Sequence, residues 1–196
     1  MKNLHKIYSD EDSEVFIFSV EQNISMLKQD IIPKDQLAKI LKYKQDIDKS
    51  KRLLSRTFLF EYSQKNYNLN NFTFEYTKNQ RPKFKYSDID FSISYSKDII
   101  AIAISKKYTV GIDIEFVEPL IVTEKTAFEF MNDNELVTFM QINEKEKHRY
   151  FYDIWTSKES FLKAKGDGLY INPKDVENEL GKSFYFQEYI INLTMI

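Results

Sequence analysis

Three short hydrophobic runs, separated by only a few residues each, limit what this chain can fold into. Phe91, Ile93 and Tyr95 alternate with serines, Ile99–Ile104 is apolar on both faces, and Val110–Glu115 follows closely. Connections this short leave no room for a crossover helix, so neighbouring strands must run antiparallel. We therefore predict an α+β fold and not a doubly wound parallel sheet.

Helices are expected on both sides of this region, where apolar residues recur at helical spacing after good capping residues. The expected helices run from Pro33 to about Tyr43, from Asp46 to about Tyr62, from Thr123 to about Met131, and from Asn143 to Lys165 just before Gly166. Asn132 with Glu135 has the pattern of a capping box. A first strand is expected at Val15–Val20.

The composition is that of a globular protein from a reducing compartment. The chain has 196 residues and no cysteine, and 42% of its residues are hydrophobic, which suits one or two compact domains. No apolar run approaches the roughly 18 residues of a membrane-spanning helix, and the N-terminus lacks the pattern of a signal peptide. We therefore expect a cytoplasmic protein that does not enter a membrane.

Charge is distributed unevenly along the chain. Residues 1–108 carry 19 basic and 14 acidic side chains, whereas residues 109–196 carry 9 and 16. This division suggests that the first half holds an anionic group and the second half a cation, although ordinary scatter gives the same pattern. Neither half has the dense basic stripe of a nucleic-acid-binding protein.

The stretch from Tyr152 to Lys163 has charges where a helix should bury apolar groups. Lys158 falls within the stripe expected to face the core, and a buried charge is costly unless it has a partner or a ligand. Trp155, Glu159 and Lys163 form one row along the same helix. A weak surface pair between Glu159 and Lys163 is the alternative explanation of that row.

The run Val110–Glu115 is the second informative stretch. If it is a strand, Gly111, Asp113 and Glu115 share one face, and the two carboxylates lie roughly 7 Å apart along it. Carboxylates that face the same way repel unless a cation lies between them, and hard oxygen ligands suit Mg²⁺. A polar, solvent-facing strand surface is the alternative, but a glycine within a strand often marks close approach by a ligand or by backbone.

Two further groups of residues have competing explanations. Lys49, Lys51, Arg52 and Arg56 lie off the apolar face of the second expected helix, where they form either a solvated surface or a phosphate site. Glu135 is a candidate site residue, but its place in a capping box is an equally good reason for its presence.

The two stretches together carry a family resemblance. Val110-Gly-Ile-Asp-Ile-Glu115, followed about forty residues later by Trp155-Thr-Ser-Lys-Glu-Ser-Phe-Leu-Lys163 and then Gly166-Asp-Gly-Leu169, resembles the paired motif of the 4′-phosphopantetheinyl transferases. The length of the chain and its strand-rich first half are similar to the surfactin-type subfamily. The resemblance implies a monomer built as a pseudo-dimer of two similar α/β halves, each an antiparallel sheet packed against helices. We place their boundary between residues 1–108 and 109–196.

The resemblance also implies roles for particular residues. Asp113, Glu115 and Glu159 would hold Mg²⁺ with the pyrophosphate of coenzyme A, with Lys158 next to them. Lys163 would assist the leaving group, and Glu135 matches a position sometimes proposed to activate the nucleophile. Residues 1–108 would hold the phosphate and adenine side of coenzyme A, with contacts expected from Lys51, Arg52, Arg81, Ser94 and Tyr95.

The implied reaction is Mg²⁺-dependent transfer of 4′-phosphopantetheine from coenzyme A to a serine of an acyl or peptidyl carrier protein, with release of 3′,5′-ADP. Glu159 or Glu135 would accept the proton of that serine. The resemblance does not indicate whether the carrier serves fatty-acid, polyketide or nonribosomal peptide synthesis.

Two departures from the family pattern leave alternatives open. Tyr95 stands where the family has histidine, and a neutral hydrogen bond to phosphate is roughly half as strong as a charged one. After Pro173 only 23 residues remain to complete the second sheet. A non-catalytic protein that binds coenzyme A or a carrier protein is therefore one alternative, and a different Mg²⁺-dependent phosphotransferase or hydrolase is another.

Overall fold

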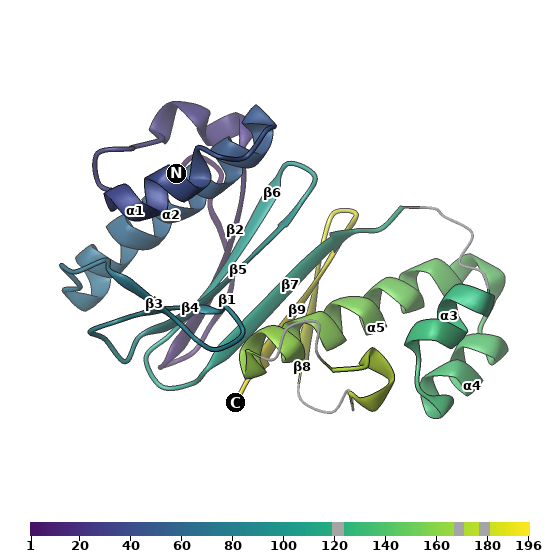
Figure 1. The fold of residues 1–196 in the computed structure, drawn as a ribbon. Coiled ribbons are helices and arrows are strands. Elements are labelled where there is room, and N and C mark those ends of the chain that lie inside the picture. The colour runs from purple at the N-terminus through teal and green to yellow at the C-terminus, as the bar shows by residue number, and fades with distance from the viewer. Residues whose placement is uncertain (119–123, 167–170, 177–180) are drawn as a thin grey trace.

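The computed structural model describes residues 1–118, 124–166, 171–176 and 181–196. It contains two stacked antiparallel sheets with helices on both outer sides (Figure 1). The α+β fold with antiparallel sheets is therefore confirmed. Thr123 and residues 167–169 of the motif lie outside the described residues, as does residue 170. Within the described ranges, no helix is long and apolar enough to cross a membrane.

The first sheet has the strand order β1-β2-β6-β5, with all neighbours antiparallel. Its strands are β1 (His5–Ser9), β2 (Ser13–Ser19), β5 (Asp90–Ser96) and β6 (Ile99–Ser105), beside a hairpin of β3 (Phe74–Tyr76) and β4 (Pro82–Phe84). Its helices are η1 (Glu21–Met26), α1 (Lys34–Ile40) and α2 (Asp46–Tyr67). An aromatic-rich core, including Phe16, Phe18 and Phe58, joins α2 to the outer face of this sheet.

The second sheet has the order β7-β9-β8. Its strands are β7 (Val110–Phe116), β8 (Gly181–Phe186) and β9 (Tyr189–Met195). The helices of this part are α3 (Glu124–Phe130), α4 (Asp133–Gln141), α5 (Glu144–Lys165) and the short η3 (Pro173–Asp175). The short C-terminal segment thus completes the sheet as a hairpin, with β9 in the central position.

Several element boundaries differ from expectation for identifiable reasons. The strand β1 was not expected, because it is an edge strand whose side chains are mostly exposed and lack an apolar pattern. Helix α2 continues past Tyr62 to Tyr67 and stops at Asn68, whose φ of 52° is left-handed and ends the helix. The expected capping box at Asn132 and Glu135 is present, and Gly166 ends α5 with a φ of 71°.

The buried face of α5 differs from the apolar stripe expected from sequence. Thr156, Ser160 and Ala164, spaced four residues apart, are fully or almost fully buried. Hydrogen bonds join Thr156 to Asn192 and Ser160 to Thr194, so this small and polar row faces β9. Two aromatic residues of α5 that were expected on the core-facing stripe, Phe151 and Trp155, contact Phe130 of α3 instead.

Strand β7 lies between α5 and the first sheet, held on the latter side by polar side chains of β5. The backbone N–H of Val110 donates to Asp90, that of Ile112 to Ser92 and that of Phe116 to Ser96, at 2.7, 3.0 and 2.9 Å. These side chains do for β7 what a neighbouring strand's carbonyls do in a sheet. The two sheets therefore meet through a ladder of side chains.

The first sheet lies within residues 1–108 and the second within residues 109–196. Each contains a helix of 22 residues packed on its outer face. The division into two functional halves stays a prediction.

Gly111 provides a test of how closely α5 must approach β7. A Cβ atom at this position would lie 1.9 Å from the backbone oxygen of Ser160 and 2.5 Å from the nitrogen of Ala164. We expect Gly111→Ala to lower the free energy of unfolding in urea by about 1–3 kcal/mol or more, because overpacking shifts the backbone. Gly181→Ala is the control: its Cβ would meet Ser157 Oγ at 3.4 Å, an ordinary contact. Equal stability of the two variants would contradict this account.

Candidate active site

Two carboxylates of β7 and two charged residues of α5 form one cluster. Strand alternation turns Asp113 and Glu115 to the face that also carries Gly111, against α5. Lys163 Nζ lies 2.6 Å from Asp113 Oδ1, and Ser94 Oγ donates to the same oxygen at 2.7 Å. Glu159, one helical turn before Lys163, interacts electrostatically with both Asp113 and Glu115. The fold thus places charged residues distant in sequence next to one another.

The cluster is electrostatically strained. Burial, followed by the charge of Asp113, raises the pKa of both Glu115 and Glu159, and the ammonium of Lys163 only partly offsets this. Asp113 is 4% exposed, and its Oδ2 atom has no hydrogen-bond partner among the described residues. A buried carboxylate oxygen without a partner is costly, so the cluster carries more negative charge than its surroundings balance.

The cluster has some, but not all, of the features of a Mg²⁺ site. In the part of the chain that the structure describes, no three acidic, histidine or cysteine side chains are gathered into a complete metal site. The chemistry of the cluster nevertheless fits the ion. It offers hard oxygen donors, an excess of negative charge over the one ammonium that contacts Asp113, and the unpartnered Asp113 Oδ2.

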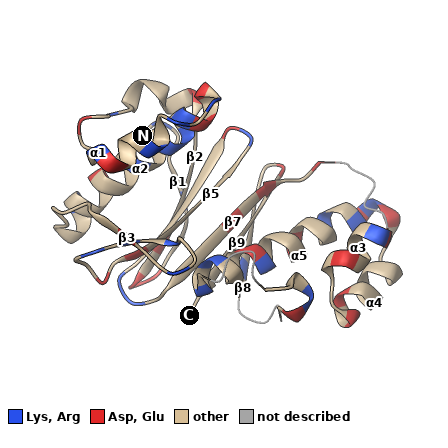
Figure 2. Ribbon diagram, viewed as in Figure 1, with Lys and Arg blue, Asp and Glu red and all other residues tan. Residues whose placement is uncertain are grey.

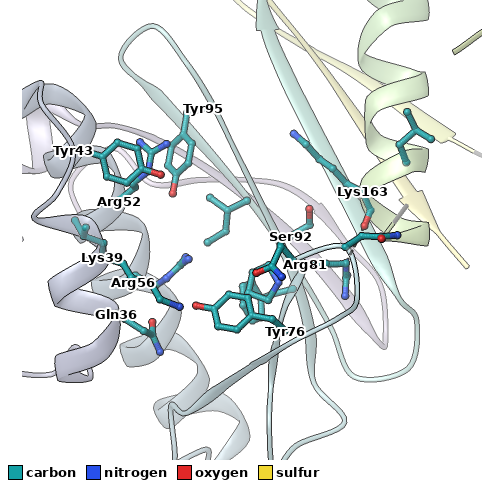
Figure 3. Close-up of a pocket in the computed structure, with 18 residues that line it drawn as sticks. Gln36, Lys39, Tyr43, Arg52, Arg56, Tyr76, Arg81, Ser92, Tyr95 and Lys163 are labelled. Carbon is teal, nitrogen blue, oxygen red and sulfur yellow. Dashed lines mark hydrogen bonds between the residues drawn. The ribbon is translucent and has the colours of Figure 1, made fainter. Parts of the chain in front are cut away.

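A cavity of about 430 Å³ adjoins the cluster, and Lys163 lies in its wall (Figure 3). Figure 2 shows the corresponding division of charge, with acidic positions on β7 and basic positions on α2. Basic and aromatic side chains from α1, the α1–α2 connection, α2, β3 and β5 line the cavity opposite Lys163. They are Lys39, Tyr43, Arg52, Arg56, Tyr76 and Tyr95. The cavity is therefore suited to a ligand that has an aromatic ring system and negatively charged groups attached to it.

Cations of the cavity wall are held on aromatic rings. The Arg52 guanidinium lies 3.7 Å from the ring centroid of Tyr43 and 5.3 Å from that of Tyr95. Lys39 Nζ lies 4.2 Å from the centroid of Tyr76. The Tyr95 hydroxyl pairs with Ser55 Oγ at 2.8 Å, which fixes its ring against the cavity. Stacking of this kind orients a cation and leaves its outer donors available to a ligand.

Arg56 lines the cavity; the sequence left open whether it belongs to a solvated surface or to a phosphate site, and it was not among the expected coenzyme contacts. Burial lowers the pKa of its guanidinium, although an arginine stays charged. Its Nη1 atom has no hydrogen-bond partner in the described part of the chain, and neither has Oε1 of Gln36, another lining residue. Its i,i+4 spacing from Arg52 puts both guanidinium groups on one face of α2.

Arg81 and Lys51 differ from their expected positions at the coenzyme phosphates. Arg81 reaches the cavity wall, but its guanidinium forms a two-pronged ion pair with Asp90 at 2.9 and 2.5 Å. Lys51 does not line the cavity, whereas Arg52 does. Ser94 lies with Asp113 and Lys163, and Tyr95 lies in the cavity wall.

Lys158 and Glu135 pair with each other, apart from the acidic cluster. Lys158 is fully buried, and its Nζ lies 2.7 Å from Glu135 Oε2, with further hydrogen bonds to the carbonyls of Pro173 and Phe130. Glu135 also accepts from the backbone N–H of Asn132. The partner that a buried lysine needs is thus Glu135, and the pair ties α4 to α5. Our expectation that Lys158 contacts the coenzyme is not supported by this geometry.

This buried pair makes a prediction for stability. Lys158→Met leaves the Glu135 carboxylate without its cation, and breaking a buried pair in this way costs about 3–5 kcal/mol. The double variant Lys158→Met with Glu135→Gln should regain much of that loss, because glutamine can keep the capping box without a charge. Urea unfolding of both variants tests this. A double variant less stable than Lys158→Met would contradict the pairing.

The sequence was compared with known proteins. Residues 109–189 match the family model of the 4′-phosphopantetheinyl transferase superfamily. The chain is 31% identical to the 4′-phosphopantetheinyl transferase gsp of Aneurinibacillus migulanus, over 85% of this chain and 65% of that protein. It is 34% identical to the 4′-phosphopantetheinyl transferase Sfp of Bacillus subtilis over 42% of this chain and 35% of that protein. It is 30% identical to the 4′-phosphopantetheinyl transferase HetI of Nostoc, over 49% of this chain and 42% of that protein.

The chain therefore spans less than two thirds of the length of each of these three relatives. The family match nevertheless includes β7 and α5, the two elements that form the acidic cluster. The similarity to gsp extends over most of the chain and supports the surfactin-type subfamily. Residues 109–189 thus match the 4′-phosphopantetheinyl transferase superfamily, and most of the chain is similar to one of its members.

Proposed function

We propose that this protein transfers 4′-phosphopantetheine from coenzyme A to a serine of an acyl or peptidyl carrier protein, with Mg²⁺ bound and 3′,5′-ADP released. The observation that carries this proposal is that the basic, aromatic cavity ends at Lys163, the residue that contacts Asp113. A nucleotide held in the cavity would extend its phosphates to the acidic cluster. The relatives are themselves 4′-phosphopantetheinyl transferases, which agrees with this reaction.

The cluster residues divide the chemistry among them. Asp113, Glu115 and Glu159 would hold Mg²⁺, which when bound neutralises negative charge on phosphate oxygens. Lys163 lies close enough to the cluster to stabilise charge on the departing 3′,5′-ADP. Ser94 bonds to both Asp113 and Lys163, so it orients the two side chains relative to each other.

The serine of the carrier protein must also lose a proton, and Glu159 is the better acceptor. Glu159 lies in the acidic cluster beside Asp113, where the phosphates of the coenzyme would be held. The carboxylate of Glu135 is already engaged by Lys158 and by the Asn132 backbone. We therefore assign the proton transfer to Glu159, directly or through water.

The nucleotide end of coenzyme A is assigned to residues 1–108. Arg52 and Arg56 are one helical turn apart on α2, line the cavity and can bind a phosphate together. They compensate for Tyr95, which offers only a neutral hydroxyl where the family has histidine. We expect the protein to act as a monomer, since both parts of this site come from one chain.

Intact-mass spectrometry tests the proposal. Protein, Mg²⁺ and coenzyme A are mixed with an apo acyl carrier protein or an apo peptidyl carrier protein, and the mass of the carrier is measured. A gain of one phosphopantetheine supports transfer. Binding of coenzyme A without any mass gain supports the alternative of a non-catalytic binding protein, and breakdown of the coenzyme without transfer supports a hydrolase.

Glu159→Gln should reduce transfer by at least about 100-fold, the size of effect seen when one group that stabilises a transition state is removed. Its folding should be intact, because the substitution removes a charge that burial disfavours. Glu146→Gln, an exposed position in the same helix, is the matched control and should transfer at the parental rate. Parental turnover by Glu159→Gln would overturn the assignment.

Arg56→Met should raise the KM for coenzyme A by about tenfold or more with a smaller change in kcat, because it removes a buried phosphate contact worth about 1.5–3 kcal/mol. Lys65→Met, an exposed position on the same helix, is the control. Steady-state kinetics with varied coenzyme A measures both constants. An unchanged KM in Arg56→Met would remove this residue from the coenzyme site.

A further inference from the structure

The guanidinium of Arg81 is almost fully used by contacts within the protein. It forms the two-pronged pair with Asp90, its Nε donates to the backbone oxygen of Lys163 at 2.8 Å, and Nη2 donates to that of Val110 at 2.9 Å. Only 9% of the side chain is exposed. An arginine has five N–H donors, and four of them are occupied here. Little remains to bind a phosphate.

The backbone around Arg81 holds this side chain in place. The turn between β3 and β4 is closed by hydrogen bonds in both directions between Thr77 and Arg81. Gly166, at the end of α5, packs on the aliphatic part of the side chain, where an added Cβ would lie 3.2 Å from Arg81 Cδ. The Arg81 side chain therefore has a fixed direction, toward Asp90 and the backbone of Val110 and Lys163.

Asp90 completes the contact on the other side. Its Oδ2 accepts the backbone N–H of Val110 at 2.7 Å, while Arg81 binds the carbonyl of the same residue. The pair thus binds both polar groups of one peptide residue at the start of β7. Three residues later along that strand lies Asp113. The same pair also holds the carbonyl of Lys163, whose ammonium contacts Asp113.

The geometry points to Arg81, held by Asp90, as a positioning residue that fixes Lys163 and the acidic strand β7 relative to each other, and not as a phosphate ligand. This inference rests on the proposed function. A displacement of about 1 Å between reacting groups can cost on the order of 100-fold in rate. The effect of losing the pair should therefore fall on kcat and not on the affinity for coenzyme A.

Arg81→Lys and Asp90→Asn separate the two roles. Lysine keeps the charge of Arg81 but cannot form the two-pronged pair and reach two carbonyls at once. If Arg81 bound a phosphate, Arg81→Lys would mainly alter the coenzyme affinity, and Asp90→Asn would free Arg81 and strengthen binding. If Arg81 positions Lys163, each variant should lose about 10- to 100-fold in kcat, with the Kd for coenzyme A unchanged within about threefold. The kcat of the double variant should be no lower than that of the less active single variant, because both substitutions disrupt the same interaction.

The control is Glu118→Gln, which breaks the exposed ion pair between Lys97 and Glu118. That pair also joins the β5–β6 turn to the end of β7, but exposed pairs contribute little, so kcat should not change. Calorimetry gives the Kd for coenzyme A, the mass assay gives kcat, and circular dichroism reports folding. If Asp90→Asn does not fold, Arg81→Lys alone decides.

An unchanged kcat in Arg81→Lys, or a tenfold weaker Kd without loss of kcat, would overturn the inference. Failure of the proposed function is a separate result, seen when the parent protein transfers nothing. In that case the coenzyme affinities still decide: tighter binding by Asp90→Asn would show Arg81 to be a phosphate ligand, and unchanged affinities in both variants would support the positioning role.

Discussion

The candidate site depends on how closely β7 is held from both sides. On one side, Gly111 lets the backbone of α5 come within the distance that a single Cβ atom would occupy. On the other, Ser92 and Ser96 of β5 replace strand carbonyls with hydroxyl groups and accept N–H groups of β7. Ser94, between them on the same face, bonds instead to Asp113 and Lys163. The packing that joins the two sheets therefore also orients the acidic cluster.

The buried charges of this protein fall into two groups: ion pairs that the protein itself satisfies, and charged groups that keep an unpartnered atom. Lys158 with Glu135 and Arg81 with Asp90 are each closed by further backbone hydrogen bonds, as buried pairs must be. The acidic cluster and Arg56 are not closed in this way. Asp113 Oδ2 and Arg56 Nη1 are buried without partners among the described residues. Atoms left in this state cost folding energy, which a bound cation and a bound anion would return.

The sequence allowed the fold class and the acidic cluster to be predicted, since alternation and helical spacing depend on local backbone geometry. It did not allow the partner of a buried charge to be predicted, because Lys158 meets Glu135 only through the packing of α4 on α5. The prediction of which face of α5 is buried was wrong for a related reason. Small residues such as Thr156 and Ser160 carry no apolar signal, yet close packing selects them. The strand β1 was missed because edge strands need no apolar face.

Under the proposed function, the cations available to bind the coenzyme come from different elements than in the family pattern. Two cationic positions are lost to phosphate binding, because Tyr95 is neutral and Arg81 is paired with Asp90. The cations that remain in the cavity wall opposite Lys163 come from α1 and α2: Lys39, Arg52 and Arg56. Arg52 is held by stacking on Tyr43 and Tyr95, so the tyrosine that replaces histidine still serves the site by fixing a neighbouring charge. With these cations on one side, the cavity would bind the negative charge of the proposed coenzyme there and leave Lys163 available for the reaction at the other end.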